Sequence, residues 1–279
     1  MGQKVQPNPV FQVGHPSPWL VERVHRYLLP VVRALWRPTL TGLENLPQQG
    51  PFLLVANHSG GFGLAEILSF VALYLQQPHP LPLAGFAHPL GFHLWPLTRL
   101  HRELGSIRST YADARSTLAL GIPILVFPGG DHEAFRPIWQ ANRVDFGGRV
   151  GFLRIAREAG VPIVPMGIQG SHFTAPMLWR SRILPFLFVI PRLCGIKRWP
   201  LSLLGALVAL ALIFALPQLG LWRFLLAFLW LSSVFALLPW IPWTVRIRVG
   251  KPIQPEELAE SLPEALKQVE AAVQTQVAP

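Results

Sequence analysis

The 279-residue chain has a single cysteine, Cys194, and only 14 acidic side chains against 24 lysines and arginines. A single thiol excludes an internal disulfide and is typical of a reducing compartment. The formal net charge of +10 would suit nucleic acid, but the arginines are scattered and the sequence contains no recognisable nucleic-acid-binding module. We therefore expect no nucleic-acid partner.

The sequence also lacks the motifs of several enzyme classes. The absence of a Gly-x-Ser-x-Gly elbow argues against a serine esterase, and the absence of a Walker loop argues against nucleotide binding. His132 and His172 each follow an expected strand, but neither is spaced from cysteine or acidic residues as zinc ligands are. We expect no metal and no bound cofactor.

The chain is instead rich in apolar residues, at 51% of the total, and contains ten tryptophans. An apolar strand expected over residues 51–56 ends in Asn57-His58 and the glycine loop 59–63. Ligands usually bind at the carboxyl ends of strands in α/β sheets, and an unperturbed imidazole titrates near neutrality. His58 is therefore a candidate general base, and the alternative is a histidine that only bonds a nearby carbonyl.

Two later segments repeat this arrangement of a strand followed by a polar loop. The expected strand 122–127 is followed by Pro128-Gly129-Gly130-Asp131-His132-Glu133, and a third strand lies within residues 161–170. Glycine amides in such loops can approach a developing oxyanion closely because no side chain intervenes, so Gly60 and Gly61, or Gly129 and Gly130, are candidate donors. The alternative role of these glycines is turn formation.

Four blocks of sequence together resemble the phospholipid/glycerol acyltransferases, the family that includes the 1-acylglycerol-phosphate acyltransferases. The blocks are Asn57-His58 with its glycine loop, Gly105-Ser106-Ile107-Arg108, Phe127-Pro128-Gly129-Gly130 through Glu133 and Arg136, and Val161-Pro162-Ile163-Val164-Pro165. Their order and spacing cover roughly residues 50 to 170 and are more specific together than singly.

The resemblance implies transfer of a fatty acyl group from a coenzyme A or carrier-protein thioester to a lipid hydroxyl. In the family, the second block helps to hold the polar head of the acceptor. Asn57 of the first block and Glu133 of the third are also expected to bind substrate. Arg108 and Arg136 could grip a phosphate or carboxylate there, although such arginines also pair with neighbouring acids. A lysophospholipid or other glycerolipid is the expected acceptor, and the Pro-Gly-Gly form of the third block leaves neutral alcohols open.

The first block departs from the family pattern at the acid that orients the histidine. The family has an aspartate five positions after the histidine, and here that position is Gly63. Glu66, eight positions after His58, resembles the later carboxylate of a longer-loop subgroup, and it begins an expected helix over residues 64–77. Glu66 could orient the imidazole or only complement the helix dipole, and Glu133 is the second candidate partner.

An uncharged apolar tract covers residues 201–243, broken by Pro217-Gln218-Leu219-Gly220 and charged only at Arg223. Each apolar run is near the lower limit for a spanning helix, so the tract predicts a helical hairpin that crosses or enters a bilayer. Positive residues flank both ends, which places the active site on the cytoplasmic side of the membrane. A shallow re-entrant hairpin and a buried helical pair are the alternatives.

These elements predict an α/β fold with a mixed, mainly parallel sheet flanked by helices and an inserted hydrophobic hairpin. The expected units are an N-terminal tail and basic amphipathic helix (1–37), an acyltransferase core (38–182), the hairpin insertion (183–243), and the last strand and closing helix (244–279). We expect residues 1–16 to be loosely ordered and not a cleaved signal peptide. The competing class is a catalytically inactive lipid-binding or scaffolding membrane protein of the same fold.

Overall fold

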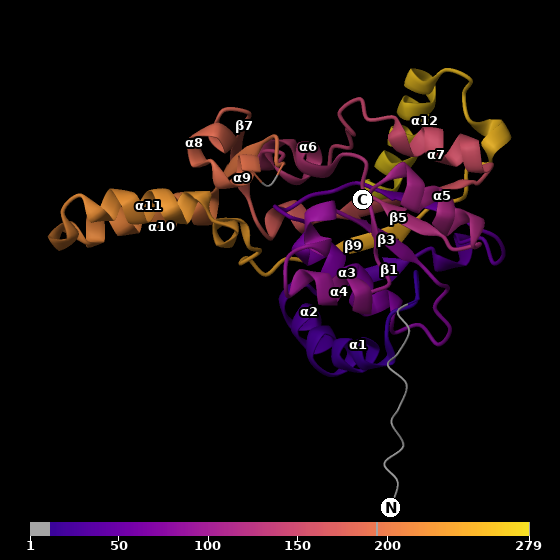
Figure 1. The fold of residues 1–279 in the computed structure, drawn as a ribbon, viewed down its shortest axis with the longest axis horizontal. Coiled ribbons are helices and arrows are strands. Elements are labelled where there is room, and N and C mark those ends of the chain that lie inside the picture. Colours follow the sequence, from indigo (N-terminus) through magenta and orange to yellow (C-terminus); the bar gives the residue numbers. More distant parts are fainter. Residues whose placement is uncertain (1–11, 194, 279) are drawn as a thin grey trace, which may run out of the picture.

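The computed structural model describes residues 12–193 and 195–278 (Figure 1). Most of the tail that we expected to be loosely ordered, and Cys194, lie outside these residues. A seven-stranded sheet of order β1-β9-β6-β2-β5-β3-β4 forms the centre of the fold. Its strands are β1 (Thr39–Thr41), β2 (Leu53–Ala56), β3 (Ala84–Ala87), β4 (Ile107–Arg108), β5 (Ile124–Val126), β6 (Ile163–Gln169) and β9 (Arg246–Val249).

Every neighbouring pair of strands in this sheet is parallel except β6 and β9, which are antiparallel. The prediction of a mixed, mainly parallel sheet flanked by helices is confirmed. β9 follows the apolar tract in sequence and lies between β1 and β6, so the tract leaves the core and returns to it. The short strands β1 and β4 were not predicted.

Helices cover both faces of the sheet (Figure 1). The helices are α1 (Pro18–Arg23), α2 (Leu29–Trp36), α3 (Leu64–Tyr74), α4 (Leu97–Glu103), α5 (Tyr111–Ala119), α6 (Gly130–Ala134), α7 (Gly151–Ala159), α8 (Leu184–Phe188), α9 (Ile190–Leu193), α10 (Leu203–Ala215), α11 (Trp222–Ser232) and α12 (Leu262–Val277). Short 3-10 turns lie at Leu43–Asn45, Pro89–Phe92, Ile138–Gln140, Ser171–Phe173, Pro217–Leu219, Val234–Leu237 and Pro255–Glu257.

The two sides of strand β2 pack against separate hydrophobic cores. Leu54 and Ala56 pack with α1, α2 and α3, whereas Leu53 and Val55 pack with α5, α7 and α12. Successive side chains of a strand point to opposite faces, which explains this division. β2 is therefore buried on both sides, and the position of the loop that follows it is well determined.

The predicted N-terminal helix runs from Pro18 to Trp36 as α1, a π-helical turn (Val24–Leu28) and α2. The π turn shifts the buried stripe, so that Val32 and Trp36 are buried while Tyr27 and Val31 are more than half exposed. The apolar positions that we expected on one face are thus divided between the core and the surface.

The apolar tract forms a hairpin of α10 and α11 that extends away from the sheet (Figure 1). Strands β7 (Met177–Ser181) and β8 (Trp199–Ser202), which the sequence did not predict, pair antiparallel at its base. The side chain of Ser202 caps α10, Gly220 turns the chain with a positive φ, and extended backbone at Ser233 ends α11. These breaks limit the helices to 13 and 11 residues.

Within the described parts of the chain, none of the helices combines the length and apolar character needed to cross a bilayer. The prediction of spanning helices is therefore not supported. In the sequence, the two apolar runs of residues 201–243 are each longer than the helix that forms, because they also contain residues of the turn and residues beyond the helix ends.

Candidate active site

The loop between β2 and α3 places His58 at the carboxyl edge of the sheet. Its last residue, Gly63, has a φ of +68°. A Cβ atom on Gly63 would collide with the imidazole of His58 and lie 2.6 Å from Glu66 Oε1. This close approach explains why a glycine occupies the position at which the family usually has an aspartate.

The carboxylate of Glu66 contacts the imidazole of His58 directly. Glu66 Oε1 accepts a short hydrogen bond from His58 Nδ1, and the glutamate is fully buried in the first turn of α3. The side chain of His58 is 14% exposed. An accepting carboxylate at Nδ1 places the ring hydrogen there and leaves Nε2 free to accept a proton.

Two serines hold the Glu66 carboxylate in place, and sequence reasoning missed both. Glu66 Oε2 accepts hydrogen bonds from the Ser59 amide (3.1 Å), the Ser59 hydroxyl (2.8 Å) and the Ser171 hydroxyl (3.0 Å). Several donors stabilise a buried carboxylate in its charged form. Ser59 stands beside the histidine in sequence, but Ser171 follows β6 and nothing in the sequence pairs it with Glu66.

Glu133 lies on the other side of His58 and does not contact the ring. Its Oε2 accepts a hydrogen bond from the backbone amide of His58 (3.1 Å), and its Oε1 accepts one from the amide of Asp145 (3.0 Å). Burial raises the pKa of Glu133 to about 8, against the opposing effect of these amides and of Arg136. The second candidate partner therefore holds the backbone of His58 and not its imidazole.

Asn57 and Arg136, both predicted to bind substrate, are buried and bonded within the protein. Asn57 donates to the carbonyl of Ile168 (2.9 Å) and accepts from the Ile168 amide (2.7 Å), which ties the loop to β6. Arg136 is 1% exposed, lies 3.5 Å from Glu133 and donates to the Arg143 carbonyl. Its guanidinium is held by protein groups, so the structure gives no support to the predicted grip on an anionic substrate.

Arg108 is exposed and forms a bidentate ion pair with Asp113, with bonds of 2.7 and 3.0 Å. The paired carboxylate raises the pKa of this guanidinium.

Two of the glycine amides proposed as oxyanion donors already donate hydrogen bonds within the protein. Gly61 donates to the Ala134 carbonyl (3.0 Å), and Gly130 donates to the Phe127 carbonyl (3.2 Å). Gly60 and Gly129 stay candidates for that role.

His132 and His172 both have lowered pKa values, chiefly because burial disfavours the charged imidazole. The pKa of His172 falls to about 3, and its Nε2 has no hydrogen-bond partner. His132 Nε2 lies 3.1 Å from the carboxylate of Asp145. In the described residues, no group of three or more histidine, cysteine, aspartate or glutamate side chains is placed to hold a metal.

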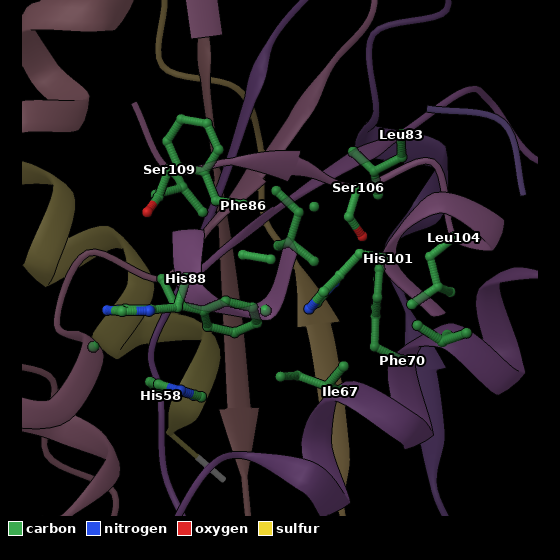
Figure 2. A pocket seen from close by; sticks show the side chains of 18 of the residues that line it. His58, Ile67, Phe70, Leu83, Phe86, His88, His101, Leu104, Ser106 and Ser109 are labelled. Atoms are coloured by element: carbon green, nitrogen blue, oxygen red, sulfur yellow. The ribbon is translucent and has the colours of Figure 1, made fainter. Parts of the chain in front are cut away.

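A cavity of about 1100 Å³ begins at His58 (Figure 2). The ring of Phe127 lies 4.8 Å from that of His58, centroid to centroid. Away from His58 the walls are mainly apolar. The apolar lining includes Ile67, Phe70, Val71, Tyr74, Leu81, Leu83, Phe86 and Leu104.

Polar and charged side chains line the cavity around the Pro-Gly-Gly loop. Arg149 lies in this part of the lining, and its guanidinium donates to the Gly129 carbonyl (2.7 Å) and pairs with Asp131. Lys197 lines the same cavity. Sequence reasoning missed Arg149, because it lies beyond the third block and carries no local motif.

The site thus combines a histidine bonded to a buried carboxylate, the carboxyl edge of a mainly parallel sheet, and an apolar cavity. Ligands usually bind at this edge in α/β proteins. Residues 37–169 match the family model described as Acyltransferase. The matched part contains all four blocks, and the match confirms the resemblance that they predicted.

The chain is also similar to individual proteins. An uncharacterised protein of Mycobacterium tuberculosis is 31% identical over 57% of this chain and 44% of its own length. The chloroplastic phytyl ester synthase 2 of Arabidopsis thaliana is 28% identical over 46% of this chain and 19% of its own length. The present chain thus spans less than half the length of either relative.

A solved structure shares the fold. The crystal structure of the 1-acyl-sn-glycerophosphate acyltransferase from Thermotoga maritima superimposes with a TM-score of 0.54, covering 93% of this chain and 79% of that one. The two sequences are 18% identical in this comparison. At this level of identity the comparison supports the fold alone.

Proposed function

We propose that the protein transfers a fatty acyl group from a thioester to a hydroxyl group of a lipid, with His58 as the general base. The observation that carries this proposal is the hydrogen bond from His58 Nδ1 to the buried Glu66, beside a cavity of about 1100 Å³. The donor is an acyl-coenzyme A or an acyl-carrier protein, and no other cofactor is required.

The reaction follows from the geometry of the imidazole. The acceptor oxygen attacks the thioester carbonyl carbon while His58 Nε2 takes the hydroxyl proton, and Glu66 stabilises the imidazolium that forms. The tetrahedral intermediate then collapses with cleavage of the carbon–sulfur bond. The thiolate leaves and takes the proton back from His58, so the enzyme returns to its starting state. Backbone amides of Gly60 or Gly129 are the candidates for stabilising the oxyanion.

The acceptor is a lysophospholipid or another glycerolipid. The Thermotoga enzyme is named for a phosphorylated acceptor, and Lys197 brings positive charge to the cavity lining. A neutral alcohol is the second candidate, supported by the Arabidopsis relative named as a phytyl ester synthase. It is also supported by the placement of Arg108 and Arg136, which are both engaged with protein carboxylates.

The test is an assay of the purified chain with labelled acyl-coenzyme A, labelled acyl-carrier protein and a panel of acceptors. The panel should contain a lysophosphatidate, a lysophosphatidylcholine, a monoacylglycerol and a long-chain alcohol. We expect a labelled ester with at least one of them. Binding of lipid without any transfer would instead support an inactive lipid-binding or scaffolding protein.

We also propose that the protein attaches to the cytoplasmic face of a membrane through the α10–α11 hairpin. Large apolar side chains near its turn are strongly exposed, including Phe214 (75%), Leu221 (84%) and Trp222 (68%). Basic residues precede and follow the hairpin in sequence. They are Arg180, Arg182, Arg192, Lys197 and Arg198 before it, and Arg246, Arg248 and Lys251 after it. With this distribution, the apolar turn of the hairpin can lie among the acyl chains of the membrane. The basic residues at its two ends can then contact anionic headgroups.

The double substitution Phe214→Asp with Trp222→Asp is expected to lower binding to anionic vesicles at least tenfold. Each large apolar side chain transferred from water contributes about 1.5–3 kcal/mol, and the aspartates add a penalty for entering lipid. Co-sedimentation with vesicles of phosphatidylglycerol and phosphatidylcholine measures the change. Trp139→Asp is the matched control, because Trp139 is 67% exposed but lies far from the hairpin in sequence. Equal binding by the double variant and the wild type would contradict attachment through the hairpin.

A further inference from the structure

Four neutral polar residues around the end of β4 line the cavity. They are Ser106, Ser109, Thr110 and Tyr111. Figure 2 shows the side chains of Ser106 and Ser109 on the opposite side of the space from Ile67. A hydroxyl group can both donate and accept a hydrogen bond, so this part of the wall can hold hydroxyl and ester oxygens without an ionic partner.

Arg108 lies in the middle of the same segment, but it is not part of the cavity lining. In the pairing of β4 with β3 it lies beside Ala87, which does line the cavity. Side chains alternate along a strand, so Arg108 leaves β4 on the side of Ser106, while Ile107 packs in the core. Arg108 therefore begins next to the cavity, and the contacts of its side chain decide whether its charge reaches the lining.

Asp113, in the first turn of α5, fixes the direction of the Arg108 side chain. Its carboxylate accepts hydrogen bonds from Arg108 Nε (2.7 Å) and Nη2 (3.0 Å). Thr110 Oγ1 in turn accepts a hydrogen bond from the Asp113 amide (3.1 Å), which holds this residue at the start of the helix. The hydrogen bond from Arg108 lowers the pKa of Asp113, so the carboxylate is charged at neutral pH and balances the guanidinium.

We propose that Asp113 is a positioning residue that makes the acceptor site select a neutral lipid alcohol, such as a monoacylglycerol, over a phosphorylated lipid. This inference rests on the proposed acyl transfer and names the class of its acceptor. The Nε and Nη2 groups form an edge of the guanidinium that can grip two oxygens of a phosphate, and Asp113 already uses that edge. A phosphate dianion would also be repelled by the Asp113 carboxylate.

The charge of a second arginine is balanced in the same way. Arg149 lines the cavity, and its guanidinium pairs with Asp131. A neutral acceptor needs no free cation, because hydrogen bonds to the hydroxyl groups near β4 suffice to hold its oxygens. The two ion pairs and the neutral wall thus favour the same class of acceptor.

The experiment measures the dissociation constants of a lysophosphatidate and a monoacylglycerol with the same short acyl chain, by isothermal titration calorimetry on the purified chain. We expect the wild type to bind the monoacylglycerol more tightly. Asp113→Asn keeps the size of the side chain but removes its charge, and it should tighten lysophosphatidate binding about tenfold, the usual effect of one charged hydrogen bond. Monoacylglycerol binding should not change, which also shows that the variant is folded. Asp113→Glu restores the carboxylate and should bind both lipids as the wild type does.

Two further variants separate the role of Arg108 from a general effect of charge. In the double variant Asp113→Asn with Arg108→Gln, the gain in lysophosphatidate binding should disappear, because the released guanidinium is missing. Glu158→Gln is the matched control. Glu158 pairs with Arg115 (2.8 Å) between α7 and α5, and neither residue lines the cavity. This control also removes one negative charge, and we expect it to bind both lipids as the wild type does.

The proposal is overturned if Asp113→Asn binds lysophosphatidate no better than the wild type, or if the gain persists in the double variant or is equalled by Glu158→Gln. Tighter binding of lysophosphatidate than of monoacylglycerol by the wild type, which the charge of Lys197 would favour, also overturns it. Because binding is measured without turnover, these outcomes are separate from the proposed reaction. The expected pattern in a protein that transfers no acyl group would leave the lipid selection standing and remove the enzymatic function.

Discussion

Replacing His58 with alanine is expected to lower the rate of acyl transfer by about a hundred- to ten-thousandfold, the usual contribution of a positioned general base. His58 is the cavity-lining histidine whose ring contacts a buried carboxylate, so its removal leaves no comparable acceptor for the proton. The side chain is partly exposed and extends into the cavity, so the fold should persist. Initial rates with a labelled thioester measure the loss, and a thermal melt checks folding.

His88→Ala is the matched control for this prediction. His88 lines the same cavity, but its Nδ1 accepts a hydrogen bond from the Leu90 amide and contacts no carboxylate. We expect its loss to change the rate by less than about tenfold, since removing a wall residue affects positioning and not proton transfer. Equal transfer by His58→Ala and the wild type would refute the general-base role.

Replacing Glu66 with glutamine is expected to cost a comparable factor, about a hundred- to ten-thousandfold in the turnover rate. Glutamine keeps the size of the side chain but removes the charge that stabilises the imidazolium and fixes the hydrogen on His58 Nδ1. The Michaelis constant for the thioester should change little, because Glu66 is fully buried and is not part of the cavity lining. Steady-state kinetics separate the two parameters.

Glu133→Gln provides the comparison that distinguishes the two glutamates. Both are fully buried near His58, but Glu133 accepts from the backbone amide and Glu66 from the ring. We expect Glu133→Gln to affect stability more than the turnover rate, because it replaces a fully buried acceptor of two backbone amides that also lies 3.5 Å from Arg136. A larger loss of turnover in Glu133→Gln than in Glu66→Gln would contradict the role of Glu66 and would indicate that Glu133 orients His58.

The site shows where sequence reasoning succeeds and where it stops. The segment 51–63 predicted a strand that ends at His58 and a glycine loop after it. Both are present, because a short apolar run and a cluster of glycines act over a few residues. The same reasoning assigned Asn57 and Arg136 to the substrate. Their types suit that role, but whether a polar side chain faces a cavity or pairs inside the protein depends on what packs against it. Here Asn57 bonds the backbone of Ile168, and Arg136 lies against Glu133.

The sequence by itself determined the α/β class, the resemblance of residues 37–169 to the acyltransferases and the histidine at the carboxyl edge of a central strand, because these depend on local periodicity and on the spacing of short motifs. Only the tertiary structure decided that Glu66 contacts the imidazole and that Ser171, from a distant loop, supports it. It also decided that the apolar tract is divided into helices of 13 and 11 residues and that Gly14, His15 and Pro16 line the cavity. The reason is physical: side-chain direction and contacts between distant segments are set by packing, which no local pattern of residues encodes.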